Sequence, residues 1–186
     1  MSNWTSEAAE WYAEKYGEYA TNRLGIDQID ISEFCTIVDV GCGTGSALRH
    51  ASAKAVNGRL IGIDPIPRMV EIAQEHTKGH PAEDRIEYFK GPAEDLPVED
   101  NLADYVLAFD SFHHWVDQRK GLSEVKRVMK TGGRFVVIKD GGLPEKSEAE
   151  HSFLTLISES GFEVIEEMNV KEGDVVFKLW VCKLKF

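Results

Sequence analysis

The chain has 186 residues, of which 42% are apolar and 28% charged, and its formal net charge is −11. This size and composition predict one globular domain with its own core and exclude a disordered chain, while the negative charge argues against nucleic acid as a partner. No apolar run approaches the roughly 20 residues of a membrane span, no signal segment is visible, and three cysteines without metal-ligand spacing favour a cytoplasmic setting and no bound metal.

Residues 1–30 predict a helical segment ahead of the first strand. Aromatic residues and one alanine recur there at helical spacing on one face, at Trp4, Ala8, Trp11, Tyr12, Tyr16 and Tyr19. This stripe either packs on the domain or forms a lid over a ligand, since aromatic faces attract cations. A connector is expected over residues 23–31, with a break at Gly25.

A buried strand is predicted over residues 36–40, because Ile and Val favour extended backbone. The strand carries Asp39 and runs into glycines at alternate positions, Gly41, Gly43 and Gly45. Glycines allow a tight turn and a close approach of backbone to a ligand. A binding site is therefore expected at the carboxyl end of this strand.

The next strand–helix unit narrows the choice of ligand. An alanine-rich helix over residues 46–55 is predicted to end at Asn57-Gly58, and a strand over residues 59–63 then leads to Asp64. An acid at that place can accept hydrogen bonds from both hydroxyls of a ribose. A dinucleotide fingerprint, however, needs glycine where Ser46 stands, so a nicotinamide dehydrogenase is disfavoured.

Two more strands are predicted over residues 85–89 and 103–109, and each leads into a polar loop. The first loop covers residues 91–97, and the second begins with Asp110-Ser111-Phe112-His113-His114-Trp115. Loops that follow parallel strands gather at one edge of a sheet, where ligands bind. The rest of the chain predicts a helix over 117–130 stopped by residues 131–133, a strand over 134–138, a helix over 151–160, and a hairpin of strands 162–168 and 175–184.

The motif Asp-x-Gly-x-Gly-x-Gly, with Asp64 after the next strand and a Lys-Thr-Gly-Gly turn at residues 130–133, resembles the class I S-adenosylmethionine-dependent methyltransferases. The likeness is to the small-molecule, type 11 group that includes ubiquinone- and menaquinone-biosynthesis enzymes, and it covers residues 34–184. It implies an α/β fold: a doubly wound, Rossmann-like, seven-stranded sheet, parallel with a carboxyl-terminal antiparallel hairpin and with helices on both faces. The chain would then comprise a helical lid segment, residues 1–30, and an S-adenosylmethionine-binding domain, residues 31–186.

The resemblance also implies which residues hold S-adenosylmethionine. They come from the glycine loop, the loops after the second to fourth strands and the lid: Asp39, Gly41, Cys42, Gly43, Gly45, Asp64, Pro65, Ile66, Ala93, Glu94, Phe109 and Tyr16. In the family, a side chain at the place of Ile66 packs on the adenine, although ordinary core packing explains Ile66 equally well. Pro92 stands where many relatives carry the Asp that holds the adenine amino group, which leaves the Ala93 amide for the ring and Glu94 or Asp95 as a substitute carboxylate.

His113, His114 and Asp110 are the candidate catalytic residues. Adjacent residues point in different directions, so the two histidines are poorly placed to chelate one metal. Histidine titrates near neutral pH, which suits a general base for an acceptor that must lose a proton. Two alternatives stay open: a histidine that only bonds neighbouring loops, and an Asp110 that holds the amino group of the methionine moiety.

The sequence thus predicts an enzyme that moves a methyl group from S-adenosylmethionine to a small-molecule acceptor. A protein-modifying or partner-dependent methyltransferase and a non-catalytic S-adenosylmethionine-binding protein are the alternatives. The acceptor site is expected in the variable loops, residues 1–30, 110–117 and 139–151. Either a monomer or a homodimer is compatible with the sequence.

Overall fold

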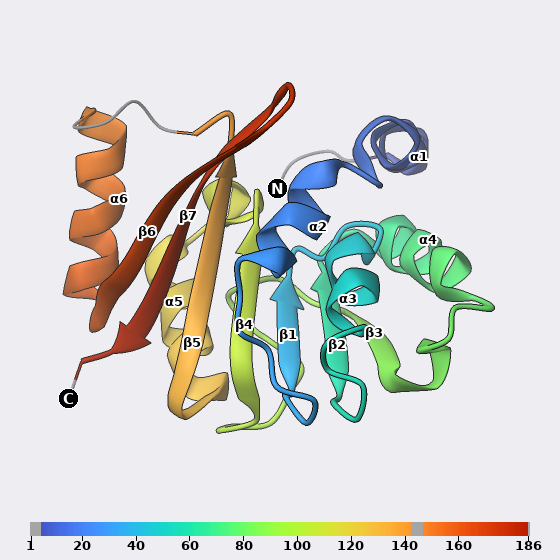
Figure 1. The fold of residues 1–186 in the computed structure, drawn as a ribbon, viewed down its shortest axis with the longest axis horizontal. Coiled ribbons are helices and arrows are strands. Elements are labelled where there is room, and N and C mark those ends of the chain that lie inside the picture. Colours follow the sequence, from blue (N-terminus) through green and yellow to red (C-terminus); the bar gives the residue numbers. More distant parts are fainter. Residues whose placement is uncertain (1–4, 143–146, 186) are drawn as a thin grey trace.

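The computed structural model describes residues 5–142 and 147–185. Its centre is a seven-stranded sheet in the order β3-β2-β1-β4-β5-β7-β6 (Figure 1). The strands are β1 (Ile37–Val40), β2 (Leu60–Asp64), β3 (Ile86–Lys90), β4 (Ala103–Phe109), β5 (Met129–Asp140), β6 (Phe162–Glu172) and β7 (Val175–Leu184). The five strands from β3 to β5 pair in parallel, and β7 is antiparallel to both β5 and β6. The predicted doubly wound sheet with a closing hairpin is confirmed.

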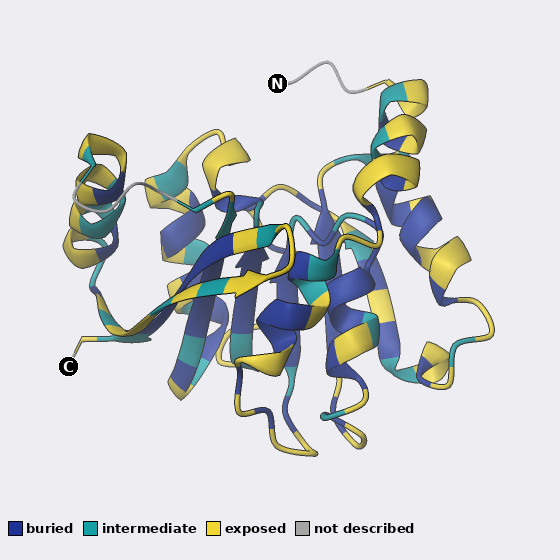
Figure 2. Ribbon diagram, turned by 45° about the horizontal axis from the view of Figure 1, so that its top comes forward, coloured by how far each residue is buried: buried dark blue, intermediate teal, exposed yellow. Residues whose placement is uncertain are grey.

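Helices cover both faces of the sheet, and the central strands are buried between them (Figure 2). The helices are α1 (Ser6–Tyr16), α2 (Ala20–Asp27), α3 (Ser46–Ala51), α4 (Pro67–Thr77), α5 (Gln118–Val128) and α6 (Glu148–Glu159), with short 3-10 turns at Glu83–Arg85 and Phe112–His114. One core joins α2, α3 and α4 to the sheet, and a second joins α5 and α6 to its other face. None of the described helices is long and apolar enough to cross a membrane.

Strand order reverses at β1, which lies between β2 and β4. The chain winds from β1 through β2 to β3 in one direction, and then returns to β4 on the other side of β1. Loops that leave the carboxyl ends of β1 and β4 therefore diverge. Ligands of such sheets bind between these loops, a region called the crevice below. Figure 1 shows α1 beside α4, beyond this edge of the sheet.

Gly25 does not break the chain as the sequence predicted; it lies inside α2. A Cβ atom at this position would overlap Ile138 Cδ1 and the ring of Phe109. Glycine is thus present because α2 packs tightly against the ends of β4 and β5, and the close packing compensates for the low helix propensity of glycine.

Two predicted boundaries in the glycine-loop and β5 regions are also wrong. The helix α3 ends at Ala51 rather than near Ala55. The guanidinium of Arg85 stabilises the non-helical residues that follow, because it donates to the carbonyls of Ala55 and Gly58. The strand β5 begins at Met129, directly after α5, because Met129 is buried and pairs with Ala103. The predicted stop at residues 131–133 is an irregularity within the strand.

Most of the aromatic stripe of the amino-terminal segment lies away from its packing face, and Tyr12 is the aromatic residue of the stripe that is partly buried against that face. The buried face of α1 carries Ala9 and Ala13, which pack on Met69 and Ile72 of α4. By contrast, the side chains on the predicted stripe are largely exposed: Trp11 56%, Tyr16 37% and Tyr19 39%. Trp4, which was predicted to belong to the same stripe, lies outside the described residues.

Candidate active site

The three glycines of the loop after β1 have different surroundings, although all three have positive φ. A Cβ atom at Gly41 would overlap the side chain of Ser111, and one at Gly45 would overlap the hydroxyl of Tyr88. A Cβ atom at Gly43 would meet nothing within 4 Å. Gly41 and Gly45 are therefore required by the packing of the protein itself, and Gly43 faces open space in which a ligand can approach the backbone.

The loop is closed onto the carboxyl end of β2. The amides of Gly41 and Cys42 both donate to the carbonyl of Ile63, at 2.7 and 3.1 Å. The carboxylate of Asp64 accepts from the amide of Gly43 at 3.2 Å and from the amide of Ile66 at 2.9 Å. Asp64 thus lies against the glycine loop, as an acid must in order to reach a ligand held there.

Two buried carboxyl groups lie at this end of the sheet. Asp39 and Asp64 are 2% and 7% exposed, and Asp39 Oδ1 has no hydrogen-bond partner among the described residues. Burial, with the nearby charge of Asp64, raises the pKa of Asp39 to about 7. Burial also raises the pKa of Asp64 to about 6, against the opposing effect of its two amide donors. Such a pair favours a cationic ligand, which would stabilise both ionised carboxylates.

The loop after β4 forms the other side of the crevice. Asp110 has a φ of 51°, which is unusual for a residue other than glycine. Its Oδ1 accepts from Lys139 Nζ at 3.0 Å and lies 4.0 Å from His113 Nδ1. The rings of His113 and His114 lie 3.9 Å apart, centroid to centroid. Burial, His114 and Lys139 together lower the pKa of His113, which keeps its imidazole neutral and able to accept a proton at neutral pH.

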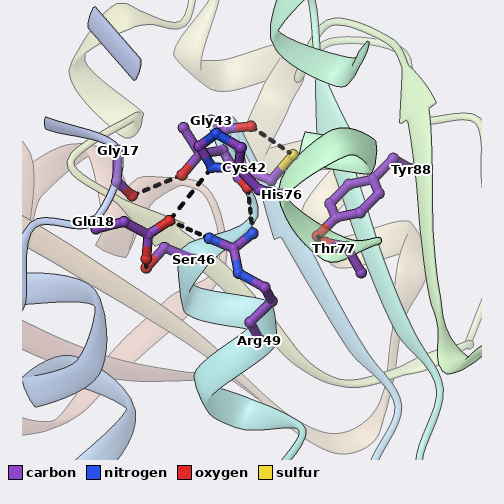
Figure 3. A network of polar contacts seen from close by, with 10 residues as sticks. Gly17, Glu18, Cys42, Gly43, Ser46, Arg49, His76, Thr77 and Tyr88 are labelled. Carbon is purple, nitrogen blue, oxygen red and sulfur yellow. Dashed lines mark hydrogen bonds and ion pairs between the residues drawn. The ribbon is translucent and has the colours of Figure 1, made fainter. Parts of the chain in front are cut away.

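The amino-terminal segment is tied directly to the glycine loop. Thr44 donates its hydroxyl proton to the carbonyl of Gly17 at 2.7 Å. The carboxylate of Glu18 accepts from Ser46 Oγ at 3.2 Å and forms an ion pair with Arg49, which also donates to the carbonyl of Thr44 (Figure 3). These contacts fix the turn between α1 and α2 on the start of α3.

Tyr12 is a residue that the sequence reasoning did not single out from the stripe. Burial raises its pKa, and so do the negative charges of Asp110, Asp140 and Asp64. The Tyr12 side chain is partly buried against the cluster that joins α1 to α4, and the charges of these acids act on its hydroxyl. Tyr16 packs on the Tyr12 ring with centroids 5.1 Å apart. Helical spacing identified the stripe, but only the direction of α1 distinguishes Tyr12 from Trp11.

Several predicted site residues have other contacts in the structure. Phe109 packs in the core beneath Gly25, and Ile66 packs with α1 and α4. Glu94 Oε1 accepts from the amide of Asp117 at 2.8 Å, at the start of α5. Pro65 is exposed and Ala93 is buried.

Cys42 is buried against Gly62 and Tyr88, and burial raises the pKa of its thiol well above the ordinary value. The thiol is therefore protonated and unreactive, as expected for a small side chain that fills space in the loop. Among the described residues, no group of three or more His, Cys, Asp or Glu side chains is arranged to hold a metal ion.

A family model described as a methyltransferase domain matches residues 38–137, which is more than half of the chain. The chain belongs to this methyltransferase family. One relative is the ubiquinone/menaquinone biosynthesis C-methyltransferase UbiE of Geobacter sp. strain M21. It is 31% identical over 118 residues, covering 63% of this chain and 50% of that protein. YrhH of Bacillus subtilis, a candidate methyltransferase, is 30% identical over 153 residues, covering 81% of this chain and 82% of that protein.

The methyltransferase fold is also found in solved structures. One example comes from the complex between the Trm112 methyltransferase activator of Haloferax volcanii and a candidate methyltransferase. A chain of that complex has a TM-score of 0.79 and 21% identity, covering 97% of this chain and 95% of that chain. The methyltransferase spans about half or less of the length of several curated relatives that it matches.

Membership of this family implies S-adenosylmethionine as the co-substrate. Three features of the methyltransferase suit that molecule: the open space at Gly43, the acceptor atom of Asp39 that lacks a partner among the described residues, and the carboxylate of Asp64 beside the loop. S-adenosylmethionine carries a sulfonium, an ammonium and two ribose hydroxyls, and each of these groups interacts favourably with a carboxylate. Pro92 offers no carboxylate to the adenine, and Glu94 is already bonded to Asp117.

Proposed function

We propose that this methyltransferase transfers the methyl group of S-adenosylmethionine to a small-molecule acceptor by in-line displacement. The observation that carries the proposal is the pairing of Asp39 and Asp64 around the open position at Gly43, in a chain of the methyltransferase family. The name of the Geobacter relative, a ubiquinone/menaquinone biosynthesis C-methyltransferase, supports a small-molecule acceptor.

S-adenosylmethionine supplies an activated methyl group, because its sulfonium is already a good leaving group. The protein then has mainly to hold the reactants in line and to exclude water. In this proposal the glycine loop and Asp39 hold the methionine part, Asp64 accepts from the ribose hydroxyls, and the amide of Ala93 serves the adenine. The residues of the amino-terminal segment, 1–30, act as a lid, with Tyr12 and Tyr16 as its aromatic wall.

On the acceptor side, His113 is the proposed general base for a nucleophile that must lose a proton. Its neutral imidazole takes that proton as the acceptor atom forms its bond to the methyl carbon, and the bond between that carbon and sulfur breaks. Asp110 lies near enough to orient or to charge-balance the imidazole. His114 is the alternative base, because its ring lies against His113.

A partner-dependent methyltransferase is the second candidate function. It is favoured by the fold shared with the chain from the Trm112 activator complex. It also follows from the short span between β5 and α6, which leaves little protein to cover an acceptor. Activity that appears only when a second protein is added would support this candidate.

The proposal is tested first by thermal melting with S-adenosylmethionine, with its demethylated product and with NAD. A ligand at about 100 times its Kd should stabilise the protein by roughly 2.7 kcal/mol, which is on the order of 5–10 °C for a chain of this size. Wild type should respond to the first two ligands only. The variant Asp64→Ala should lose the response, and Asp84→Ala, at an exposed acid outside the crevice, should retain it.

The second stage is an acceptor screen that follows methyl transfer from labelled S-adenosylmethionine. Binding of S-adenosylmethionine without turnover of any acceptor would favour the non-catalytic alternative. A melting response to NAD alone would contradict the proposed function.

A further inference from the structure

We propose that Lys139 is a positioning residue for methyl transfer, which holds the Asp110 carboxylate beside the His113 imidazole without letting it trap the ring as an imidazolium. This inference rests on the proposed function, in which His113 is the base. It gives a role to a lysine that does not itself belong to the cofactor-binding loop.

The ends of β4 and β5 bring these groups together. Phe109 and Ile138 are paired in register, so Asp110 and Lys139 follow side by side. Lys139 Nζ donates to Asp110 Oδ1 at 3.0 Å, and the amide of Asp140 donates to the same oxygen at 3.2 Å. Both donors come from β5, so this strand fixes one oxygen of the carboxylate.

The backbone of Asp110 is held as firmly as its side chain. Its φ of 51° lies in the left-handed region, which is unfavourable for a residue with a Cβ atom. The amide of Asp110 donates to the carbonyl of Ile138 at 2.9 Å. A strained residue persists only where its surroundings fix it, and such residues cluster at functional sites. Here the fixing contacts all come from β5.

The same arrangement limits how Asp110 acts on His113. Asp110 Oδ1 lies 4.0 Å from His113 Nδ1, which is too far for a hydrogen bond. The carboxylate therefore acts on the imidazole through space, and the ammonium of Lys139 on the same oxygen offsets its charge. Without Lys139, an uncompensated Asp110 would be free to form an ion pair with His113.

The other charges around His113 do not replace Lys139. His114, on the same 3-10 turn, opposes protonation of His113, as Lys139 does. On β7, Lys178 is the register partner of Lys139, but its ammonium is bound by Glu150 and Glu167. From α1, Tyr12 faces the acids as a neutral phenol, because its pKa is raised. The backbone amide of Asp140 donates to Asp110, and the Asp140 carboxylate accepts a hydrogen bond from the hydroxyl of Thr21.

Stability alone does not explain the pair. The side chains of Lys139 and Asp110 are about one-third exposed, at 32% and 33%, and ion pairs that reach solvent contribute little to folding. The ion pair between Lys139 and Asp110 lies beside His113, and we infer that it acts on this imidazole rather than on folding.

The test is an NMR titration of the imidazole rings, which requires neither S-adenosylmethionine nor an acceptor. The chain has six histidines, and His113→Gln assigns the resonance of His113. In wild type, His113 should titrate below its ordinary value of about 6.5. In Lys139→Met its pKa should rise by about half a pH unit or more, because a nearby positive charge is lost.

Three variants make the titration specific. Lys139→Arg keeps the charge and should leave the titration of His113 unchanged. Lys130→Met removes a matched lysine, also on β5, which pairs with Asp104 at the other end of β4 at 2.7 Å, and it should have no effect. In the Asp110→Asn background, Lys139→Met should shift His113 by less than it does in wild type, because Lys139 acts through Asp110.

Activity then gives a second measurement. The acid limb of the pH–rate profile should move up with the His113 pKa in Lys139→Met, so the loss of rate should be larger at pH 6.5 than at pH 8. An unmoved His113 in Lys139→Met, or an equal shift in the Asp110→Asn background, would overturn the role of Lys139. The expected titration in a protein that transfers no methyl group would instead count against the proposed function.

Discussion

The hydroxyl of Thr44 and the carbonyl of Gly17 are joined by a buried hydrogen bond of 2.7 Å. Thr44 belongs to the glycine loop and is 3% exposed, whereas Gly17 ends α1. A Cβ atom at Gly17 would overlap both the carbonyl of Ala13 and the methyl of Thr44. The amino-terminal segment and the glycine loop therefore fit together closely, and we expect a substitution in one to alter the stability of the other.

Replacing Thr44 with Val should destabilise the protein and weaken its binding of S-adenosylmethionine. Valine keeps the shape but leaves the Gly17 carbonyl without this donor, which costs about 1–3 kcal/mol for a buried group. Melting curves and calorimetric titration measure the two effects. Thr131→Val, at an exposed threonine, is the control. Unchanged affinity in Thr44→Val would mean that the contact is only structural.

Glu18→Gln should loosen the amino-terminal segment with little change in global stability. The carboxylate of Glu18 is well exposed, so its ion pair with Arg49 contributes under about 1 kcal/mol. It nevertheless joins Ser46 and Arg49 to the segment (Figure 3). Amide exchange in α1 should become faster, because local opening depends on local contacts. The control is Glu14→Gln, at an exposed acid on α1, which should leave amide exchange in this helix unchanged.

Alanine at Gly43 and alanine at Gly45 should have opposite consequences. At Gly45 the new methyl group overlaps the Tyr88 hydroxyl, so the variant should lose several kcal/mol of stability or fail to fold. At Gly43 only the left-handed backbone opposes alanine, at about 1–2 kcal/mol. Gly43→Ala should therefore fold and lose S-adenosylmethionine binding, measured by melting and titration. Normal binding by folded Gly43→Ala would contradict the proposed ligand position.

The raised pKa of Asp39 predicts how stability depends on pH. A folded-state pKa of about 7, against an ordinary value of 3.8, means that the folded protein binds this proton more tightly than the unfolded chain. Protonated Asp39 therefore contributes to the stability of the folded state. This contribution is largest below about pH 4 and is lost as the pH rises through 7. Asp39→Asn should therefore be more stable than wild type at pH 8, by up to about 4 kcal/mol, and equally stable near pH 4.

Denaturation curves of the ligand-free protein across this range measure the effect. Asp104→Asn is the control, because Asp104 is paired with Lys130 at the opposite end of the sheet. A stability difference that is independent of pH would show that Asp39 is not protonated in the folded state.

Tyr12 and Tyr16 should contribute unequally to a lid. Tyr12 is partly buried and its pKa is raised by burial and by the charges of Asp110, Asp140 and Asp64, whereas Tyr16 is 37% exposed. Tyr12→Ala should weaken S-adenosylmethionine binding about tenfold or more, which is the loss expected from removing a desolvated cation–π contact of roughly 1.5–2 kcal/mol. Tyr16→Ala should weaken it less. Equal effects would argue that the aromatic stripe acts only as a unit.

The alternation of strands and helices was readable from the sequence because apolar runs and glycine turns are local signals. The strand at Ala103–Phe109 and the hairpin turn near Gly173 were placed correctly for that reason. The errors lie where a distant element overrides the local signal. Gly25 reads as a break, but Ile138 and Phe109, far along the chain, require a glycine inside a helix.

By itself the sequence determined the family, the doubly wound sheet with its closing hairpin and the acids at the strand ends, because these depend on residue type and spacing along the chain. Only the tertiary structure decided which glycine is open, since the neighbours of Gly41 and Gly45 are Ser111, in the loop after β4, and Tyr88, on β3. It also decided that Lys139 and the amide of Asp140 donate to one oxygen of Asp110, and that Tyr12 is partly buried whereas Trp11 is exposed. Those relationships depend on the register of β4 with β5 and on the direction of α1, which long-range packing fixes and no local pattern encodes.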